Sequence, residues 1–219
     1  MMTYEQIKEN EKIKTYIKGA DESLKAMGFT EHSAAHVTKT ASTAEYILSE
    51  LGYDSHMVEL AKIAAHLHDI GNLVNRVDHS QSGAIMAFRI LDKLDFDAQD
   101  IAVIVSAIGN HDEGTGVAVN PAAAALILAD KSDVRRTRVR NRDFTTFDIH
   151  DRVNYSVVKS ELSFNEEKTA IVLNLEIDTT ISPVMDYFEI FLGRMSMCRR
   201  AAESLGLRFM LVINGQSLA

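Results

Sequence analysis

Apolar residues recur at helical spacing through roughly the first 130 residues of the chain, from residue 4 to about residue 131. Val58, Ile63 and Leu67 illustrate the pattern, which places apolar side chains on one face of a helix. Glycine or aspartate interrupts the pattern at short intervals, near positions 28, 52–54, 71, 95–97 and 109. We therefore expect five to seven helices in this part of the chain.

The pattern changes after an arginine-rich stretch at residues 135–142. Residues 157–162 and 170–177 have the composition and alternation of β-strands, and residues 165–168 are the expected hairpin turn between them. In the second strand the apolar side chains that share one face are Ile171, Leu173, Leu175 and Ile177. A helix from residue 183 to about residue 205 and a last strand at 207–213 should follow.

Only two prolines occur in the chain, and both are expected to mark helix starts. Pro121 follows Asn120, and Pro183 follows Ser182. Asparagine and serine are good N-cap residues, and proline is tolerated in the first turn of a helix.

These patterns predict a mainly α protein with a small C-terminal α+β extension of β-β-α-β order. The helical part should comprise residues 1–150 and the extension residues 151–219. Because no flexible linker or low-complexity segment separates them, we expect the extension to pack directly on the helices.

Composition limits the kinds of partner. The hydrophobic fraction of 46% is ordinary, and no apolar run approaches the roughly 18 residues of a membrane span. The net charge of -8 argues against general nucleic-acid binding and leaves a small phosphorylated ligand possible. Cys198 is the only cysteine, which excludes an internal disulfide and fits a reducing compartment. The N-terminus has no signal-peptide pattern, so a cytoplasmic location is expected.

The adjacent pair His68-Asp69 ends a helix whose preceding residues are largely apolar. A charged group in such a setting needs a partner, commonly a metal ion. Other imidazoles and carboxylates occur at expected helix ends or on apolar helices, at His36, His79, His111 and Asp130.

The order His, His-Asp, His, His, Asp over residues 36–130 resembles the HD superfamily of metal-dependent phosphohydrolases. The resemblance implies the helical bundle of an HD domain. It also implies that His36, His68, Asp69 and Asp130 hold a first divalent metal. Asp69 would bridge to a second metal, held also by His79 and His111.

Four histidines among six ligands favour a transition metal over magnesium or calcium. Iron or manganese is our first expectation, with nickel, cobalt and zinc as alternatives. Two such metals can clamp both oxygens of an in-line displacement at phosphorus. The resulting hypothesis is hydrolysis of a phosphomonoester, a nucleotide or a dinucleotide, with Asp69 at the reacting centre. Asp112 or Glu113 would protonate the leaving oxygen.

The chain departs from the HD-GYP relatives, which cleave a cyclic dinucleotide. Those proteins carry a second histidine where this chain has Asp112, and a GYP triplet soon after, where this chain has EGTGV at 113–117. Many relatives also have a lysine where this chain has Asn72.

Three cations follow Asp130 within two helical turns, namely Lys131, Arg135 and Arg136. They are candidates for binding the substrate phosphate through charge-assisted hydrogen bonds, and the alternative is a solvated helix face. We expect solvent or contacts with the extension for the arginines that follow, at positions 138, 140 and 142.

The other histidines are expected to stay outside the site. His32 should face solvent, His66 should point away from His68, and His150-Asp151 repeats the dipeptide at the junction to the extension, where a capping role fits. Glu31, Asp112 or Glu113 could orient metal-bound histidines.

Methionines and phenylalanines in the segment FEIFLGRMSMC should pack the last helix against the sheet. Subunit contacts are the alternative use of this stripe, so a homodimer is an open option.

Two other functions share the ligand pattern. A minority of HD proteins use two irons to activate oxygen and cleave a carbon–hydrogen bond. Other relatives keep the helical shape as regulatory or binding modules without turnover, although they typically lose ligands.

Overall fold

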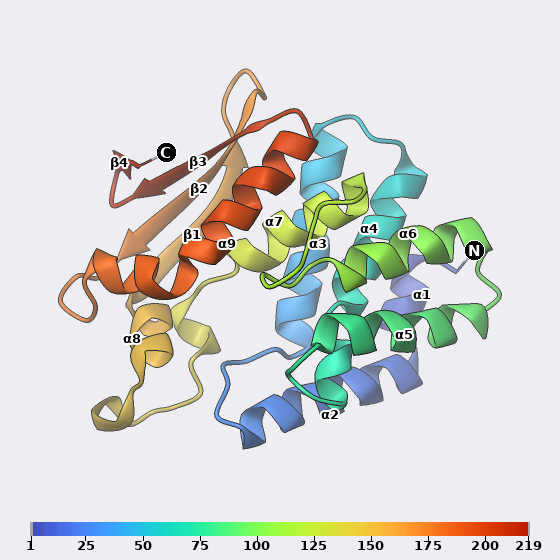
Figure 1. Cartoon of the computed structure of the whole chain (residues 1–219), viewed down its shortest axis with the longest axis horizontal. Coiled ribbons are helices and arrows are strands. Elements are labelled where there is room, and N and C mark those ends of the chain that lie inside the picture. Colours follow the sequence, from blue (N-terminus) through green and yellow to red (C-terminus); the bar gives the residue numbers. More distant parts are fainter. Residues whose placement is uncertain (1, 219) are drawn as a thin grey trace.

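The computed structural model describes residues 2–218. Its first part is helical, as Figure 1 shows in blue to green. The α-helices of this part are α1 (Tyr4–Lys8), α2 (Glu11–Ala26), α3 (Ala34–Glu50), α4 (Ser55–Leu67), α5 (His79–Asp92), α6 (Ala98–Gly109) and α7 (Pro121–Ser132). A short 3-10 helix, η1 (Ile70–Leu73), joins α4 to the loop before α5.

Polar side chains cap several of these helices at the predicted breaks. Asp54 caps α4 by accepting a hydrogen bond from the backbone N–H of Met57, and Asn120 caps α7 by accepting one from Ala123. The prediction for Pro121 is therefore confirmed. Pro183 also marks a helix start, because it is the N-cap of α9 (Val184–Ser204). Ser182 is not the N-cap, and its hydroxyl donates to Asp186.

Helix α7 forms the centre of the molecule. Each residue from 122 to 132 is buried, so this helix has no solvent-facing stripe. It contacts α3, α4 and α6 on the helical side and α9 on the side of the extension. An all-round apolar helix such as PAAAALILAD is suited to this position, because it must be covered on every side.

The C-terminal extension is a four-stranded sheet covered by α9. The strands are β1 (Val157–Phe164), β2 (Ala170–Ile177), β3 (Arg208–Ile213) and β4 (Gln216–Ser217), in that spatial order. β2 and β3 are parallel and are connected through α9, whereas the other two pairings are antiparallel. The predicted β-β-α-β order is present, and the two-residue strand β4 is an addition.

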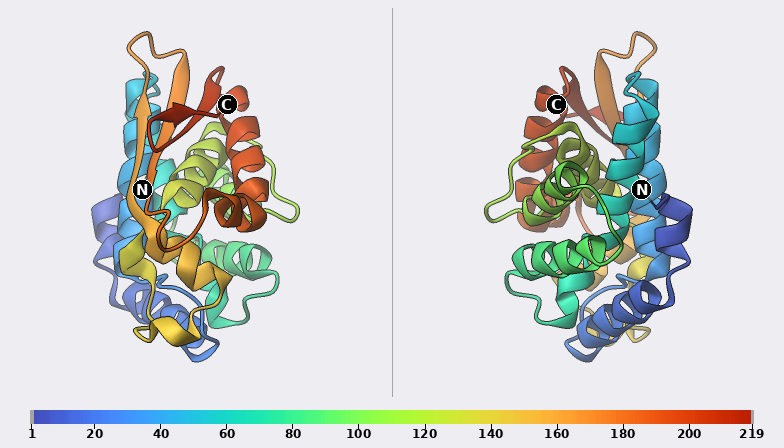
Figure 2. Two further views of the ribbon diagram at one scale, coloured as in Figure 1. Left: turned by 90° about the vertical axis from the view of Figure 1, so that its left-hand side faces the viewer. Right: turned by 90° about the vertical axis from the view of Figure 1, so that its right-hand side faces the viewer.

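The predicted apolar face of β2 is buried, with Ile171, Leu173 and Leu175 fully inaccessible. Helix α9 lies against β2, β3 and α7, and its side chains Tyr187 and Phe191 are buried. Figure 2 shows this layering from the sides, with the red helix α9 beside the orange strands. The prediction of a mainly helical protein with a small α+β extension is confirmed.

Helix α8 (Ile149–Ser156) was not predicted. Asp148 is its N-cap and accepts a hydrogen bond from the backbone N–H of Asp151. His150 and Asp151 therefore lie in the first turn of a helix, and the capping residue is their neighbour. Two further 3-10 turns precede it, η2 (Arg136–Arg138) and η3 (Phe144–Thr146).

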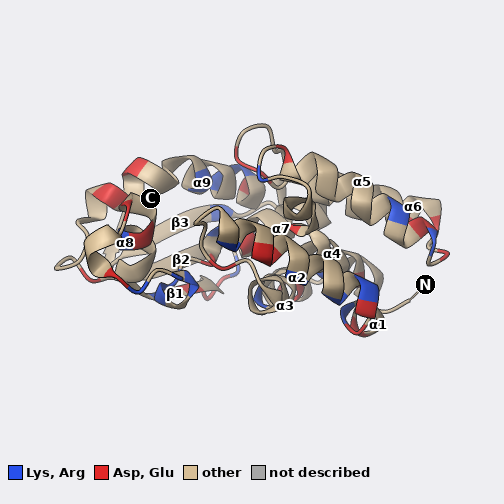
Figure 3. Ribbon diagram, turned by 90° about the horizontal axis from the view of Figure 1, so that it is seen from below, with Lys and Arg blue, Asp and Glu red and all other residues tan. Residues whose placement is uncertain are grey.

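Lysine and arginine alternate with acidic residues along the ribbon in Figure 3, without forming a continuous basic stripe in that view. Among residues 2–218, no helix combines the length and the apolar character needed to cross a lipid bilayer.

The boundary at residue 150 between the helical part and the C-terminal extension stays a prediction.

Candidate metal centre

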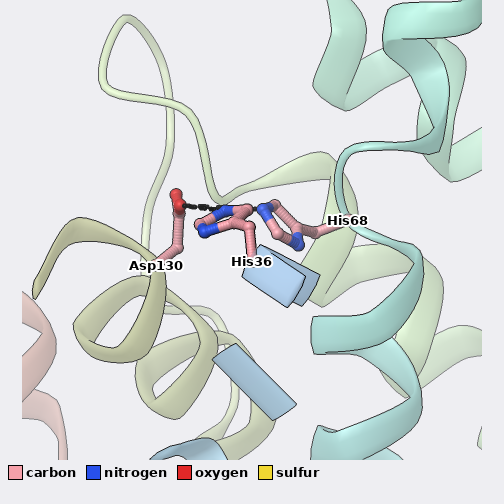
Figure 4. Close-up of side chains that lie close together, drawn as sticks. All are labelled: His36, His68 and Asp130. Atoms are coloured by element: carbon pink, nitrogen blue, oxygen red, sulfur yellow. Dashed lines mark ion pairs between the residues drawn. The ribbon is translucent and has the colours of Figure 1, made fainter. Parts of the chain in front are cut away.

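Five different segments bring the six predicted ligands together at buried positions. His36 lies in the first turn of α3, His68 is the C-cap of α4, and Asp69 follows it directly. His79 begins α5, His111 follows α6, and Asp130 lies in the last turn of α7. In Figure 4, His36, His68 and Asp130 point toward one another from three separate elements.

Four ligand atoms converge at the first group. His36 Nε2 lies 3.2 Å from Asp130 Oδ1 and 3.6 Å from Asp69 Oδ2, and His68 Nε2 lies 3.6 Å and 3.2 Å from the same two oxygens. Donors bound to one metal at about 2.1 Å lie roughly 3.0 to 3.4 Å apart, so these separations suit a shared cation.

A second group forms around the other oxygen of Asp69. His79 Nε2 lies 3.6 Å from Asp69 Oδ1 and 3.1 Å from His111 Nε2. Asp112 Oδ1 is 4.0 Å from His79 Nε2. Asp69 thus faces the first group with Oδ2 and the second with Oδ1, which is the arrangement that a bridging carboxylate requires.

Three of these buried atoms have no hydrogen-bond partner within residues 2–218: His36 Nε2, His68 Nε2 and Asp69 Oδ2. A buried polar atom without a partner is costly, and such atoms rarely gather by chance. A cation between them would satisfy all three at once, so the residues present fit a divalent metal. His/Asp sets that could hold one are His36, His68 and Asp130, and His68, Asp69 and His111.

The electrostatics of the group favour a cation as well. Burial by itself would lower the pKa of His68, but the carboxylates of Asp69 and Asp130 outweigh it and raise the pKa to about 10. A proton on His68 therefore offsets the two negative charges when no metal does so. A divalent cation is the natural replacement for that proton.

Each histidine of the site points its other ring nitrogen at a fixed acceptor. Nδ1 of His68, His79 and His111 donates to a backbone oxygen, at 2.7, 3.1 and 2.6 Å. His36 is different, because its Nδ1 donates to a carboxylate, Asp133 Oδ2, at 2.8 Å. These bonds leave the four Nε2 atoms facing the cluster, and they set the ring orientations.

Asp133 is the site residue that sequence reasoning missed. We expected Glu31, Asp112 or Glu113 to orient the ligands, and none of them contacts Nδ1 of a site histidine. The available signal was the spacing of Asp130 and Asp133, three residues apart and thus on one side of the helix end.

The carboxylate of Asp133 is held by three cations. Lys39 Nζ and Arg135 Nε lie 2.7 and 2.8 Å from its Oδ1, and Arg138 Nη1 lies 3.7 Å from its Oδ2. Although burial opposes it, the bond from His36 and the charge of Arg138 hold the pKa of Asp133 well below its usual range. The carboxylate is therefore ionised and fixed in place.

Arg138 is not at the surface, which corrects our expectation of solvent or extension contacts. It is 4% exposed, and its guanidinium donates to the backbone oxygens of Glu31 and Asp133. It ties the loop before α3 to the end of α7, and so supports the pairing of His36 with Asp133.

The three cations proposed for substrate lie in different places. Lys131 is buried beside the cluster, 2.8 Å from Asp130 Oδ2 and 3.4 Å from Glu113 Oε1. Arg135 pairs with Asp133 and Glu31. Arg136 turns toward the extension, where it donates to the backbone oxygen of Tyr155 and stacks over the Tyr155 ring.

Glu113 pairs with Lys131 and with Arg194 of α9, whose Nε lies 2.6 Å from Oε1. Against the effect of burial, these two cations lower the pKa of Glu113 to about 2. An acid so easily ionised is a poor proton donor near neutral pH. This low pKa argues against the proton-donor role expected for Glu113.

His32 is half-buried and does not lie fully in solvent, because its ring packs edge-on against the ring of His36 with centroids 5.5 Å apart. It precedes α3 and its Nδ1 donates to the backbone oxygen of Thr30. His66 is buried on the opposite side of α4 and packs edge-on against Tyr4, as the prediction that it points away from His68 requires.

Gly71 allows the turn between the two groups of ligands. A Cβ at this position would lie 2.0 Å from the backbone oxygen of His79 and 2.4 Å from the backbone nitrogen of Gly83. Only glycine permits this approach of η1 to α5, which brings His79 toward Asp69.

The chain is similar to known proteins. The chain is 25% identical to an uncharacterized protein of Methanocaldococcus jannaschii, in a match covering 86% of this chain and 80% of that protein. A crystal structure of a predicted HD superfamily hydrolase from an uncultured Thermotogales bacterium is 28% identical, covers 57% of this chain and 67% of that one, and has a TM-score of 0.44. The family model of the HD domain matches residues 33–151, which is more than half of the chain. The protein therefore belongs to the HD domain family.

Proposed function

We propose that the protein is a metal-dependent hydrolase of phosphoric esters, acting on a phosphomonoester, a nucleotide or a dinucleotide through one or two divalent transition metals. One observation carries the proposal: the unpartnered, buried atoms His36 Nε2, His68 Nε2 and Asp69 Oδ2 face one another. Iron or manganese is the favoured metal, since histidines dominate the donor set.

His36, His68, Asp69 and Asp130 would hold the first metal, and Asp69, His79 and His111 the second. When bound, divalent metals supply Lewis-acid chemistry, by lowering the pKa of water and neutralising charge on phosphate oxygens. The remaining requirements fall to the side chains around them.

Asn72 and Lys131 orient the two carboxylates. The Asn72 amide donates to Asp69 Oδ1 at 2.8 Å and to the Asp69 backbone oxygen at 2.9 Å, which fixes the rotation of that carboxylate. Lys131 holds Asp130 Oδ2, so that Oδ1 faces His36. Preorganised ligands of this kind need little rearrangement during the reaction.

We assign to Asp112 the delivery of the proton to the leaving oxygen, because Lys131 and Arg194 hold Glu113 as a carboxylate. It lies beside the second group of ligands, and its side chain is 33% exposed. Its position also allows it to serve as a ligand oxygen.

The test is a substrate screen on protein reconstituted separately with iron, manganese, nickel, cobalt and zinc. Phosphomonoesters, nucleotides and dinucleotides are supplied, and the release of phosphate or of mononucleotides is recorded in parallel with oxygen uptake. We expect release from at least one class in the absence of oxygen. Oxygen uptake that depends on substrate, without phosphate release, would replace the proposal with an oxygenase. Metal binding with neither activity would indicate a regulatory module.

A further inference from the structure

A pocket of about 330 Å³ lies beside the metal centre, where three parts of the chain meet. One wall is the loop between α2 and α3, including Phe29 and His32, and a second is Arg76, from the loop before α5. The third wall comes from α8 and α9, including His150, Phe191 and Arg194.

The pocket adjoins the cluster of ligands on two sides. His32 packs against the ligand His36, and Arg76 Nη1 lies 3.2 Å from the ligand His79 at Nε2. From the side of the extension, Arg194 reaches the cluster through Glu113 and Lys131, the latter in contact with Asp130.

Three guanidinium groups line this pocket, and two of them have N–H groups that can donate hydrogen bonds to a ligand. Arg138 is committed to the backbone oxygens of Glu31 and Asp133. Arg76 and Arg194 are partly exposed and lie over aromatic rings, Arg76 at 5.8 Å from Phe29 and Arg194 at 4.4 Å from Phe191. Since Arg194 pairs with Glu113 through Nε, its two terminal nitrogens remain available to another acceptor.

We propose that this pocket is the substrate site, and that Arg76 and Arg194 bind the phosphate of a small phosphomonoester. The inference rests on the proposed function and narrows it. Two guanidinium forks held against aromatic rings suit an anion with several oxygens and two charges, which a terminal phosphate offers and a phosphodiester does not.

The volume of the pocket limits the size of the organic group that the ligand can carry. Its volume is at the lower end of the roughly 300 to 1,000 Å³ of small-molecule sites, which suits a ligand no larger than a mononucleotide. Asp148, Asp151 and Asn154 line the side formed by α8 and supply acceptors for hydroxyl or amino groups. A dinucleotide would exceed this space.

The proposal gives the extension a role in the reaction. Arg194 lies beyond residues 33–151, where the family model matches, and it is connected to the metal ligands through charged side chains. Residues of α8 and α9 would then take part in selecting the substrate, in addition to the helical bundle.

Binding of phenylphosphonate to the manganese-loaded, full-length protein tests the inference by calorimetry. This probe has a dianionic head and one small organic group, and it cannot be hydrolysed as an ester. Arg76→Gln and Arg194→Gln should each weaken binding by at least about tenfold, because each removes a charged hydrogen-bond donor. Arg199→Gln is the matched control on α9, since Arg199 has a side chain 64% exposed and should leave affinity unchanged. Diphenyl phosphate, a diester with one charge, should bind far more weakly than phenylphosphonate.

Metal content and circular dichroism of each variant separate lost binding from lost folding, and Arg194→Lys should recover part of the affinity. Equal affinity of wild type and both glutamine variants would overturn the inference, as would equal binding of the diester or no binding to the wild type. If the wild type cleaved phosphate esters but phosphonate binding did not depend on Arg76 and Arg194, the proposed function would stand and the assignment of this pocket would be wrong. Arginine-dependent binding without hydrolysis of any ester would keep the pocket and reject the reaction.

Discussion

Asp133 Oδ2 accepts a 2.8 Å hydrogen bond from Nδ1 of His36, and both side chains are almost completely buried. The bond connects the first turn of α3 to the end of α7 across 97 positions of sequence. It turns Nε2 of His36 toward Asp69 and Asp130. The first metal group therefore depends on a carboxylate that is not itself among the proposed ligands.

Replacing Asp133 with asparagine should weaken the binding of the first metal by about 10- to 100-fold, as loss of such orienting partners typically does. The amide keeps the volume but removes the charge opposite Lys39, Arg135 and Arg138. Equilibrium dialysis against manganese measures the change. Asp178→Asn is the matched control, because Asp178 lies on the surface between β2 and α9, and it should bind metal as the wild type does. Unchanged affinity in Asp133→Asn would refute the role given to Asp133.

Replacing Asp133 with alanine should lower the free energy of unfolding below that of the wild type. It leaves the buried cation Arg138 without its carboxylate partner, and breaking a buried pair in this way costs about 3 to 5 kcal/mol. Urea titration of the metal-free variant and the metal-free wild type measures the difference. Equal stabilities of Asp133→Ala and the wild type would show that the charge pair contributes little.

Gly71→Ala should lower stability by about 1 to 3 kcal/mol, because the new Cβ would overlap the backbone of His79 and Gly83. The displaced α5 should also carry His79 away from Asp69, so fewer metal ions should be retained per chain. Gly114→Ala is the control, since a Cβ there meets nothing within 4 Å and should change stability by less than about 0.5 kcal/mol. Thermal unfolding and metal analysis of both variants measure these effects. Equal stability and equal metal content of the two variants would argue against the close approach of η1 to α5 at Gly71.

The buried side chain of His66 should make the stability of the folded protein sensitive to acid. Burial lowers its pKa to about 4 in the folded protein, from 6.5 for a free histidine. The unfolded chain therefore binds a proton first as the pH falls below 6.5, and the folded state loses stability through that range down to about pH 4. Between pH 7 and pH 5 the loss from this residue is about 2 kcal/mol.

Replacing His66 with leucine should remove that part of the pH dependence while keeping an apolar contact with Tyr4. Urea unfolding of the metal-free protein at the two pH values measures it. If the variant lost as much stability as the wild type between pH 7 and pH 5, the neutral, buried state assigned to His66 would be wrong.

The candidate ligands could be named from sequence because their order resembles that of the HD superfamily, and because each one also carries a local signal. His68-Asp69 follows an apolar helix, and His36, His79, His111 and Asp130 lie at or near helix ends, where a break in periodicity is visible. Their convergence follows from the bundle, which the periodicity also indicates. The burial of the apolar face of β2 was predictable for the same reason.

The supporting contacts were not predictable, because they depend on how distant segments pack. The pairing of Asp133 with His36 depends on the register of α3 against α7. Arg138 is buried by the loop before α3, so its place in an arginine-rich stretch gave no indication of its role. Helix α8 spans only residues 149–156 and has too little periodicity to be distinguished from a loop.

Metal content and phosphate release of Asp69→Asn, measured beside the wild type and Asp178→Asn, test the central claim most directly. Asp69 faces both groups of ligands, so a single change should disturb both. We predict one or two divalent ions per chain and hydrolysis of a phosphomonoester for the wild type and the control, and neither for Asp69→Asn. Retention of metal and activity by Asp69→Asn, or a wild type that binds no metal after reconstitution, would contradict the account.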